Sequence, residues 1–207
     1  MAEELQPVEK FKFACYPGIK CFNECCQNLT LALTPYDVLR MSRALSITTS
    51  EFLEKYTTWH VGMATGLPVV VLKIQNGKCP FVTERGCSIY NDRPTPCRLY
   101  PLVRVRSHGE ERYYLLVEEF CRGHGEGRWW DIREWIEDQQ VEEYNRMNDL
   151  FFELISAASG RELSEEKVRK IFESCFDIDS FKATIGIDDD VEAVMAGIRY
   201  AIEVVKH

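Results

Sequence analysis

The stretch CYPGIKCFNECC, residues 15–26, places four cysteines close together and decides how the rest of the chain is interpreted. Its spacing is Cys15-x5-Cys21-x3-Cys25-Cys26, and five more cysteines follow along the chain: Cys79, Cys87, Cys97, Cys121 and Cys175. A cluster this dense is typical either of a disulfide-bonded secreted domain or of a metal site. The compartment that the sequence indicates decides between these two interpretations.

The N-terminal segment gives no indication of export. MAEELQPVEKFKF, residues 1–13, lacks the apolar core and the small-residue cleavage site of a signal peptide. No apolar run approaches the length of about 20 residues that spans a bilayer. We therefore expect a cytoplasmic protein outside the membrane. In a reducing cytosol, dense cysteines favour metal ligation or redox work over structural disulfides.

Composition is that of an ordinary globular protein, with 45% hydrophobic and 28% charged residues in 207. The net charge of −8 is concentrated in residues 122–207, which hold 11 Lys and Arg against 20 Asp and Glu. An acidic region repels phosphate backbones, so we expect no nucleic-acid binding. We expect instead that acidic C-terminal helices offer a surface to a protein partner.

Several helix starts and strands are visible in the first 121 residues. Thr34, followed by a proline and an acid, predicts a capped helix over roughly 35–45. Thr48 and Glu51 have the spacing of a capping box and predict a helix over roughly 49–58. The β-branched run at 68–74 precedes an Asn-Gly turn, and a second hairpin is expected between 102–106 and 112–118.

The last third of the chain has helical periodicity. Apolar residues at three- and four-residue steps predict a helix over roughly 130–158, a second over 164–176, and a third that follows Asp188–Asp190. The fold class is therefore expected to be α+β. We expect a cysteine-rich metal-binding domain with a small antiparallel sheet and short helices at 1–127, and a helical region at 128–207 packed on it.

Thiolates are soft, charged donors that suit zinc and iron–sulfur clusters. Four of them hold one tetrahedral zinc ion or one cluster, so eight allow two sites, or one site with spare or redox-active thiols. Adjacent side chains usually point in different directions, so Cys25 and Cys26 rarely bind one ion together. If both are ligands, two metals or a multinuclear cluster are favoured; the alternative is one ligand beside one buried thiol.

Other residues are candidates for supporting roles. Arg93 and Arg98 flank Cys97. We expect both arginines to support a metal centre without binding the metal, because nearby cations lower the pKa of a thiol and offset the negative charge of a thiolate-bound metal. The alternative is that they form ion pairs on the surface. Cys175 lies in an apolar helical pattern and is expected to be a buried, inert thiol. The glycine-alternating segment 123–127 suggests a flexible joint, and His124 within it is a secondary candidate ligand.

Three further segments, together with the N-terminal quartet, resemble a known family: Gly77–Phe81 (GKCPF), Gly86–Tyr90 (GCSIY) and Arg93–Pro101 (RPTPCRLYP). Over roughly residues 13–125 the chain resembles the YkgJ-like cysteine-cluster family, described as a zinc- or iron-chelating domain. The resemblance implies one metal-binding set: Cys15, Cys21, Cys25, Cys26, Cys79, Cys87, Cys97 and Cys121. The chain departs from the family where its opening pair is wider than the usual C-x2-C and Phe22 replaces a glycine.

The function expected from these observations is metal binding through cysteine thiolates, with zinc or an iron–sulfur cluster in one or two sites. Such a metal would join segments about 100 residues apart and contribute directly to folding. The alternative is an iron–sulfur oxidoreductase that transfers electrons. The sequence contains no Walker loop, dinucleotide fingerprint or metalloprotease motif, and it assigns no catalytic residue.

Overall fold

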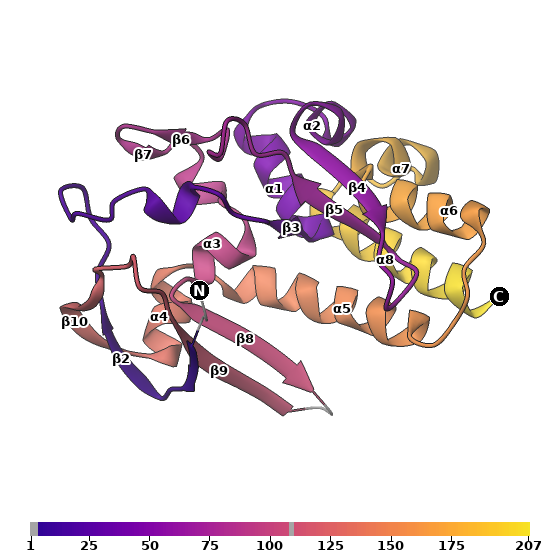
Figure 1. Ribbon diagram of the computed structural model, residues 1–207. Coiled ribbons are helices and arrows are strands. Elements are labelled where there is room, and N and C mark those ends of the chain that lie inside the picture. The colour runs from indigo at the N-terminus through magenta and orange to yellow at the C-terminus, as the bar shows by residue number, and fades with distance from the viewer. Residues whose placement is uncertain (1–3, 108–109) are drawn as a thin grey trace. The chain divides into compact units, whose positions relative to one another are not determined.

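The computed structural model of the chain describes residues 4–107 and 110–207 and has the expected α+β class, with small antiparallel sheets, short helices and a helical C-terminal region (Figure 1). Its residues form two compact units that alternate along the chain. The first comprises Met1–Leu29, Ile74–Tyr90 and Thr95–Glu142. The second comprises Thr30–Lys73, Asn91–Pro94 and Glu143–His207.

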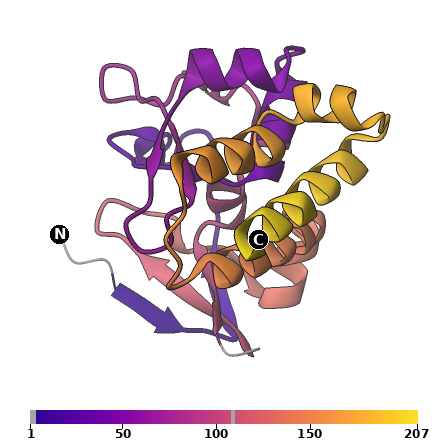
Figure 2. The ribbon, with the colours of Figure 1, turned by 90° about the vertical axis from the view of Figure 1, so that its right-hand side faces the viewer.

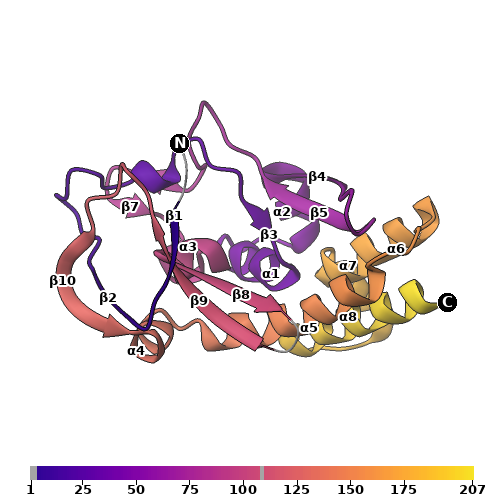
Figure 3. The same cartoon turned by 60° about the horizontal axis from the view of Figure 1, so that its bottom comes forward.

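The first unit contains three small antiparallel sheets. β1 (Glu4–Pro7), β9 (Glu110–Val117) and β8 (Leu102–Ser107) form one sheet in that order. β10 (His124–Asp131) pairs with β2 (Lys10–Phe13), and β6 (Val82–Thr83) pairs with β7 (Gly86–Cys87); Figure 3 shows β10 alongside β2. The hairpin of β8 and β9 confirms the predicted strands, although part of its tip, at 108–109, lies outside the described residues.

Short helical segments connect these strands. They are the 3-10 turns η1 (Glu24–Cys26) and η2 (Tyr90–Asp92), the latter at a boundary of the two units along the chain, and the helices α3 (Thr95–Leu99) and α4 (Ile132–Asp138). One core cluster of the first unit consists of six buried hydrophobic residues: Phe11, Phe13, Leu99, Leu102, Trp135 and Val141. Within it the Trp135 indole donates a hydrogen bond of 2.9 Å to the Leu99 carbonyl, which satisfies both buried polar groups.

The second unit joins a sheet to six helices. β3 (Ala32–Leu33), β5 (Pro68–Leu72) and β4 (Thr57–Val61) form an antiparallel sheet in that order. The helices are α1 (Pro35–Ala44), α2 (Thr49–Tyr56), α5 (Glu142–Ala158), α6 (Glu165–Cys175), α7 (Ile178–Ile185) and α8 (Asp190–Lys206). Figure 2 shows α6, α7 and α8 from the side of the C-terminus. Capping boxes at Thr34 and Thr48 confirm the two predicted helix starts.

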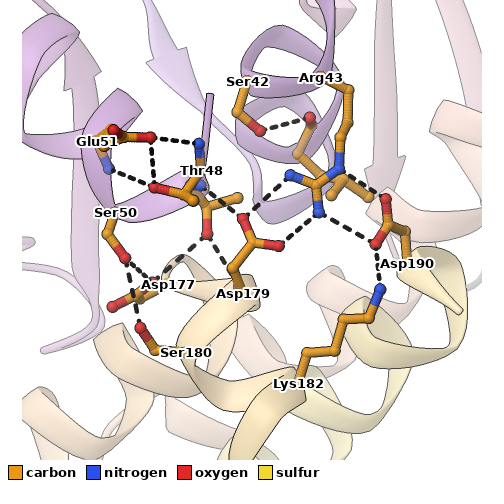
Figure 4. Close-up of polar contacts among 12 residues, drawn as sticks. Ser42, Arg43, Thr48, Ser50, Glu51, Asp177, Asp179, Ser180, Lys182 and Asp190 are labelled. Carbon is orange, nitrogen blue, oxygen red and sulfur yellow. Dashed lines mark hydrogen bonds and ion pairs between the residues drawn. The ribbon is translucent and has the colours of Figure 1, made fainter. Parts of the chain in front are cut away.

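A polar network connects α1 and α2 to α7 and α8 within the second unit (Figure 4). The Arg43 guanidinium on α1 donates hydrogen bonds to both carboxylate oxygens of Asp179, at 3.0 and 2.6 Å, and to Asp190 at 2.7 Å. Lys182 donates to the same Asp190 at 2.7 Å, and the Thr49 amide donates to Asp179 at 2.7 Å. Some of the C-terminal acids are therefore occupied in fixing helices to one another.

The predicted helix over 130–158 was wrong in its extent. Strand β10 continues to Asp131, α4 and α5 are separate helices, and Gln140 between them has a left-handed backbone with φ of 52°. The spacing of Asp131 and Glu134 forms a capping box that starts α4, which the apolar periodicity concealed. The segment expected to be a flexible joint also contributes its last four residues to β10, and α7 was not anticipated.

Among residues 4–107 and 110–207, no helix combines the length and the hydrophobicity needed to cross a bilayer.

Candidate metal centre

Four of the predicted cysteines line a single small cavity in the first unit. They come from three separate parts of the chain: Cys15 follows β2, Cys21 and Cys25 lie just before and within η1, and Cys121 precedes β10. The other residues around the cavity are mainly aromatic: Phe13, Tyr100, Phe120 and Gly123. The fold therefore brings thiols that are up to about 100 residues apart in sequence to one place.

The two ends of this cysteine set are held together by backbone contacts. The Ala14 amide donates a hydrogen bond of 3.2 Å to the Gly123 carbonyl, beside Cys15 and Cys121. A Cβ atom at Gly123 would lie 2.7 Å from the Ala14 oxygen and 2.7 Å from the Phe13 ring, so only glycine permits this approach. The close approach that the glycine-alternating segment suggested is thus made to the chain itself.

A tight turn positions the remaining two thiols. The Glu24 amide donates to the Cys21 carbonyl at 3.0 Å, and Asn23 takes a left-handed conformation with φ of 70° before η1. The Arg122 amide donates a hydrogen bond of 3.0 Å to Cys21 Sγ. Backbone amides that donate to ligand sulfurs are among the outer contacts that orient and tune a thiolate metal centre.

The thiols around the cavity oppose one another's ionisation. Although part of its side chain is open to solvent, desolvation raises the pKa of Cys15 to about 11, and the nearby thiols of Cys25, Cys21 and Cys121 contribute in the same direction. Four thiolates around one cavity would repel one another, and a bound cation would offset that repulsion. The arrangement therefore suits a cationic metal or cluster.

The aromatic wall makes the cavity less polar. Burial, followed by the neighbouring Cys121 and Glu118, raises the pKa of the Tyr100 phenol well above its usual range. The Phe13 ring contacts Tyr100 and His124 edge to face, at centroid distances of 5.8 and 5.5 Å. Burial lowers the pKa of His124, a group that the sequence offered as a secondary ligand and that does not border the cavity in the described chain.

The other predicted site residues lie elsewhere. None of the other four cysteines borders the cavity: Cys26 ends η1, Cys79 precedes β6, Cys87 lies in β7 and Cys97 lies in α3. Arg98 is buried and donates a hydrogen bond of 2.5 Å to the Gln139 carbonyl, whereas Arg93 is a buried residue of the second unit. Cys175 is fully buried in α6, as expected, and burial raises its pKa to about 12, which disfavours the reactive thiolate.

All nine cysteines are free thiols. In the part of the chain that the structure describes, no three or more His, Cys, Asp or Glu side chains are grouped closely enough to hold a metal ion as they stand. Neutral thiols do not attract one another, and zinc–sulfur bonds of about 2.3 Å would bring them closer together. Binding therefore requires side-chain rearrangement within the cavity.

Sequence reasoning missed the cavity's aromatic residues. Tyr100 lies inside the segment Arg93–Pro101 that carries the family resemblance, and Phe120 is adjacent to Cys121. Phe13 is separated from Cys15 by one residue and ends a strand of alternating burial. Their proximity to cysteines in sequence was the available indication, but only the fold shows that they share one cavity.

Comparison with known proteins identifies the family. The profile of the CxxCxxCC family, described as "Putative zinc- or iron-chelating domain", matches residues 14–122. The chain belongs to the CxxCxxCC family. This match confirms the resemblance drawn from the cysteine motifs, and the CxxCxxCC domain includes all eight clustered cysteines. No curated protein and no solved structure shows significant similarity to the chain.

Proposed function

We propose that this CxxCxxCC protein binds zinc or an iron–sulfur cluster through Cys15, Cys21, Cys25 and Cys121. The observation that carries the proposal is that these four thiols, from three parts of the chain, border one cavity. Four thiolates are the complete ligand set of a structural zinc site and of a single iron–sulfur cluster. The family's zinc- or iron-chelating description supports the same chemistry.

The surroundings of the four thiols fit such a group. Cys21 already accepts a hydrogen bond from a backbone amide, as coordinated thiolates do. A bound cation would offset both the desolvation and the repulsion from neighbouring thiols that raise the pKa of Cys15. The aromatic side chains of Phe13, Tyr100 and Phe120 would restrict water around the centre. When bound, zinc supplies a fixed cross-link between segments, and an iron–sulfur cluster supplies an electron carrier.

The test is metal analysis of the full chain after anaerobic purification. We expect stoichiometric zinc, or iron with acid-labile sulfide, in the wild-type protein. Cys121→Ser removes one ligand of the cavity and is expected to lower the metal content. Cys175→Ser is the matched control, because Cys175 is buried in α6 away from the cavity. Absence of metal in a protein whose thiols are all reduced would overturn the proposal.

Electron transfer by an iron–sulfur cluster is the second candidate function. It is favoured by the hydrogen bond to Cys21 Sγ and by the aromatic surroundings, since hydrogen bonds to sulfur and solvent exclusion set the reduction potential of a cluster. A brown protein whose visible absorbance is bleached by dithionite and restored by air would support this function. A colourless, zinc-loaded protein would exclude it.

A further inference from the structure

Tyr100 borders the cysteine cavity and carries a buried hydroxyl that forms no hydrogen bond within residues 4–107 and 110–207. Buried hydroxyls of folded proteins nearly always have a partner, because a group without one has lost its hydrogen bonds to water and gained nothing in return. At the wall of a candidate metal cavity, such a hydroxyl points to a partner that it acquires only when the cavity is occupied.

The position of the Tyr100 ring is set by contacts that do not involve its hydroxyl. The Tyr100 amide donates a hydrogen bond of 3.1 Å to the Pro96 carbonyl of α3, and the next carbonyl, that of Pro101, accepts the Leu116 amide of β9 at 2.9 Å. The Phe13 ring packs edge to face against the phenol at a centroid distance of 5.8 Å. The fold therefore holds the ring in place and does not need the oxygen to do so.

Two groups that can accept a hydrogen bond lie near the Tyr100 hydroxyl. They are the Cys121 sulfur and the Glu118 carboxylate, which act together with burial to raise the pKa of the phenol. Of the two residues, Cys121 borders the cavity together with Tyr100, whereas Glu118 does not. The cavity therefore pairs the hydroxyl with the Cys121 sulfur, and Glu118 is the competing acceptor.

The chemistry of sulfur explains why this pair would form a hydrogen bond only when metal is bound. A neutral thiol is a weak acceptor, so it gives a phenol little reason to orient toward it. A cysteine that binds a metal first loses its proton, and a thiolate is an acceptor with negative charge. Hydrogen bonds to charged acceptors are about twice as strong as those between neutral groups. Loss of the Cys121 proton would therefore satisfy the buried hydroxyl of Tyr100.

We propose that Tyr100 is a positioning residue of the metal centre, whose hydroxyl donates a hydrogen bond to the Cys121 sulfur once that sulfur is a metal-bound thiolate. This inference rests on the proposed function of the cavity cysteines and deepens it. The rigidly held phenol directs one ligand, as the Arg122 amide, which donates at 3.0 Å, directs Cys21. The hydroxyl thus contributes to metal affinity and to the electron density on sulfur, and it contributes nothing to the fold of the metal-free chain.

Cobalt titration of the reduced full-length chain tests this role, because thiolate-bound Co²⁺ absorbs light and replaces zinc in four-thiolate sites. The part of the cobalt spectrum that Cys121→Ser abolishes defines the cavity centre. In that part, Tyr100→Phe should weaken cobalt binding roughly ten- to a hundredfold. It should also shift the sulfur-to-cobalt charge-transfer bands to lower energy, because a sulfur without the hydrogen bond gives up its electrons more easily. The metal-free variant should melt at or above the wild-type temperature, since it has lost an unsatisfied buried hydroxyl.

Tyr36→Phe is the matched control, and the opposite pattern is expected for it. Tyr36 is a buried tyrosine on α1 in the second unit, and its hydroxyl accepts a hydrogen bond of 3.3 Å from the Arg40 guanidinium. Loss of this bond should lower the melting temperature of the metal-free chain by roughly 2–4 °C. Cobalt affinity and the charge-transfer bands should stay at their wild-type values.

The possible outcomes separate the role of Tyr100 from the proposed function. Wild-type cobalt affinity and unshifted bands in Tyr100→Phe overturn this inference and leave the cavity proposal standing. A lower melting temperature of the metal-free Tyr100→Phe variant also overturns it, because the hydroxyl would then have a structural partner without metal. A wild-type chain that binds no cobalt, or a Cys121→Ser variant that keeps the whole cobalt spectrum, overturns the proposed function itself.

Discussion

Phe13 links the core of the first unit to the candidate metal centre, and its truncation is expected to weaken both. The side chain is 4% exposed, borders the cysteine cavity, and contacts Tyr100, His124 and Trp135 edge to face at centroid distances of 5.5–5.8 Å. Phe→Ala in a core costs about 3–5 kcal/mol. Three aromatic contacts, each contributing about 0.5–1.5 kcal/mol beyond burial, place Phe13→Ala toward the upper part of that range.

The loss of folding free energy has a consequence for metal binding. We assume that the metal binds only the folded first unit. If a variant loses more free energy than the unfolding free energy of that unit, the metal-free unit is unfolded, and metal binding has to supply the difference. This difference appears as a weaker apparent metal affinity. Each 1.4 kcal/mol corresponds to about a tenfold change, so Phe13→Ala should weaken metal binding by up to about a thousandfold. The effect requires no change in any cysteine.

Urea denaturation of the metal-free chain and competition with a chromophoric zinc chelator measure the two quantities. Phe52→Ala is the matched control, because Phe52 is an equally buried phenylalanine on α2 in the second unit. The control should lose a similar amount of stability and keep its metal affinity. An unchanged unfolding free energy in Phe13→Ala, or equal loss of metal affinity in both variants, would refute this reasoning.

Three further predictions concern the scaffold of the metal-free chain. Arg43 and Lys182 hold the pKa of Asp190 at about 2, below its ordinary 3.8. Because the pKa is lower in the folded chain, ionised Asp190 stabilises the fold above about pH 4, and this stabilisation disappears as the pH falls toward 2. Solvent weakens the interaction, since the Asp190 side chain is 33% exposed. Urea unfolding should therefore show that Arg43→Met costs about 1 kcal/mol at pH 7 and little near pH 2. Gly127→Ala introduces a Cβ 2.6 Å from a neighbouring side chain at φ of 70°, whereas Gly125→Ala at φ of 82° meets open space. Thermal unfolding should therefore show a loss of about 1 kcal/mol for Gly125→Ala and a further 1–3 kcal/mol, roughly, for Gly127→Ala; equal losses would contradict the steric argument. Thr34→Ala removes the capping box of α1 and should cost about 1 kcal/mol by the same measurement, and an unchanged melting temperature would show that the cap contributes nothing.

Sequence by itself determined the features that depend on local chemistry. Side chains such as Thr34 and Thr48 cap helices through amides only three residues away, so both helix starts were predictable. The β8–β9 hairpin and the buried Cys175 followed in the same way from nearby residues. Metal binding was also predictable, because the density and order of the cysteines already resembled the zinc- or iron-chelating family that the chain belongs to.

The tertiary structure decided which cysteines are neighbours. Spacing alone allowed eight thiols to be divided in many ways, since the distance between Cys15 and Cys121 depends on the pairing of β2 with β10 and on Gly123 approaching Ala14. The break between α4 and α5 likewise follows from the left-handed Gln140 and from the hydrogen bond of Trp135 to Leu99, which apolar periodicity does not encode. Contacts between distant segments depend on how the whole unit packs, and this is why the sequence named candidate ligands while only the fold shows that four of them border one cavity.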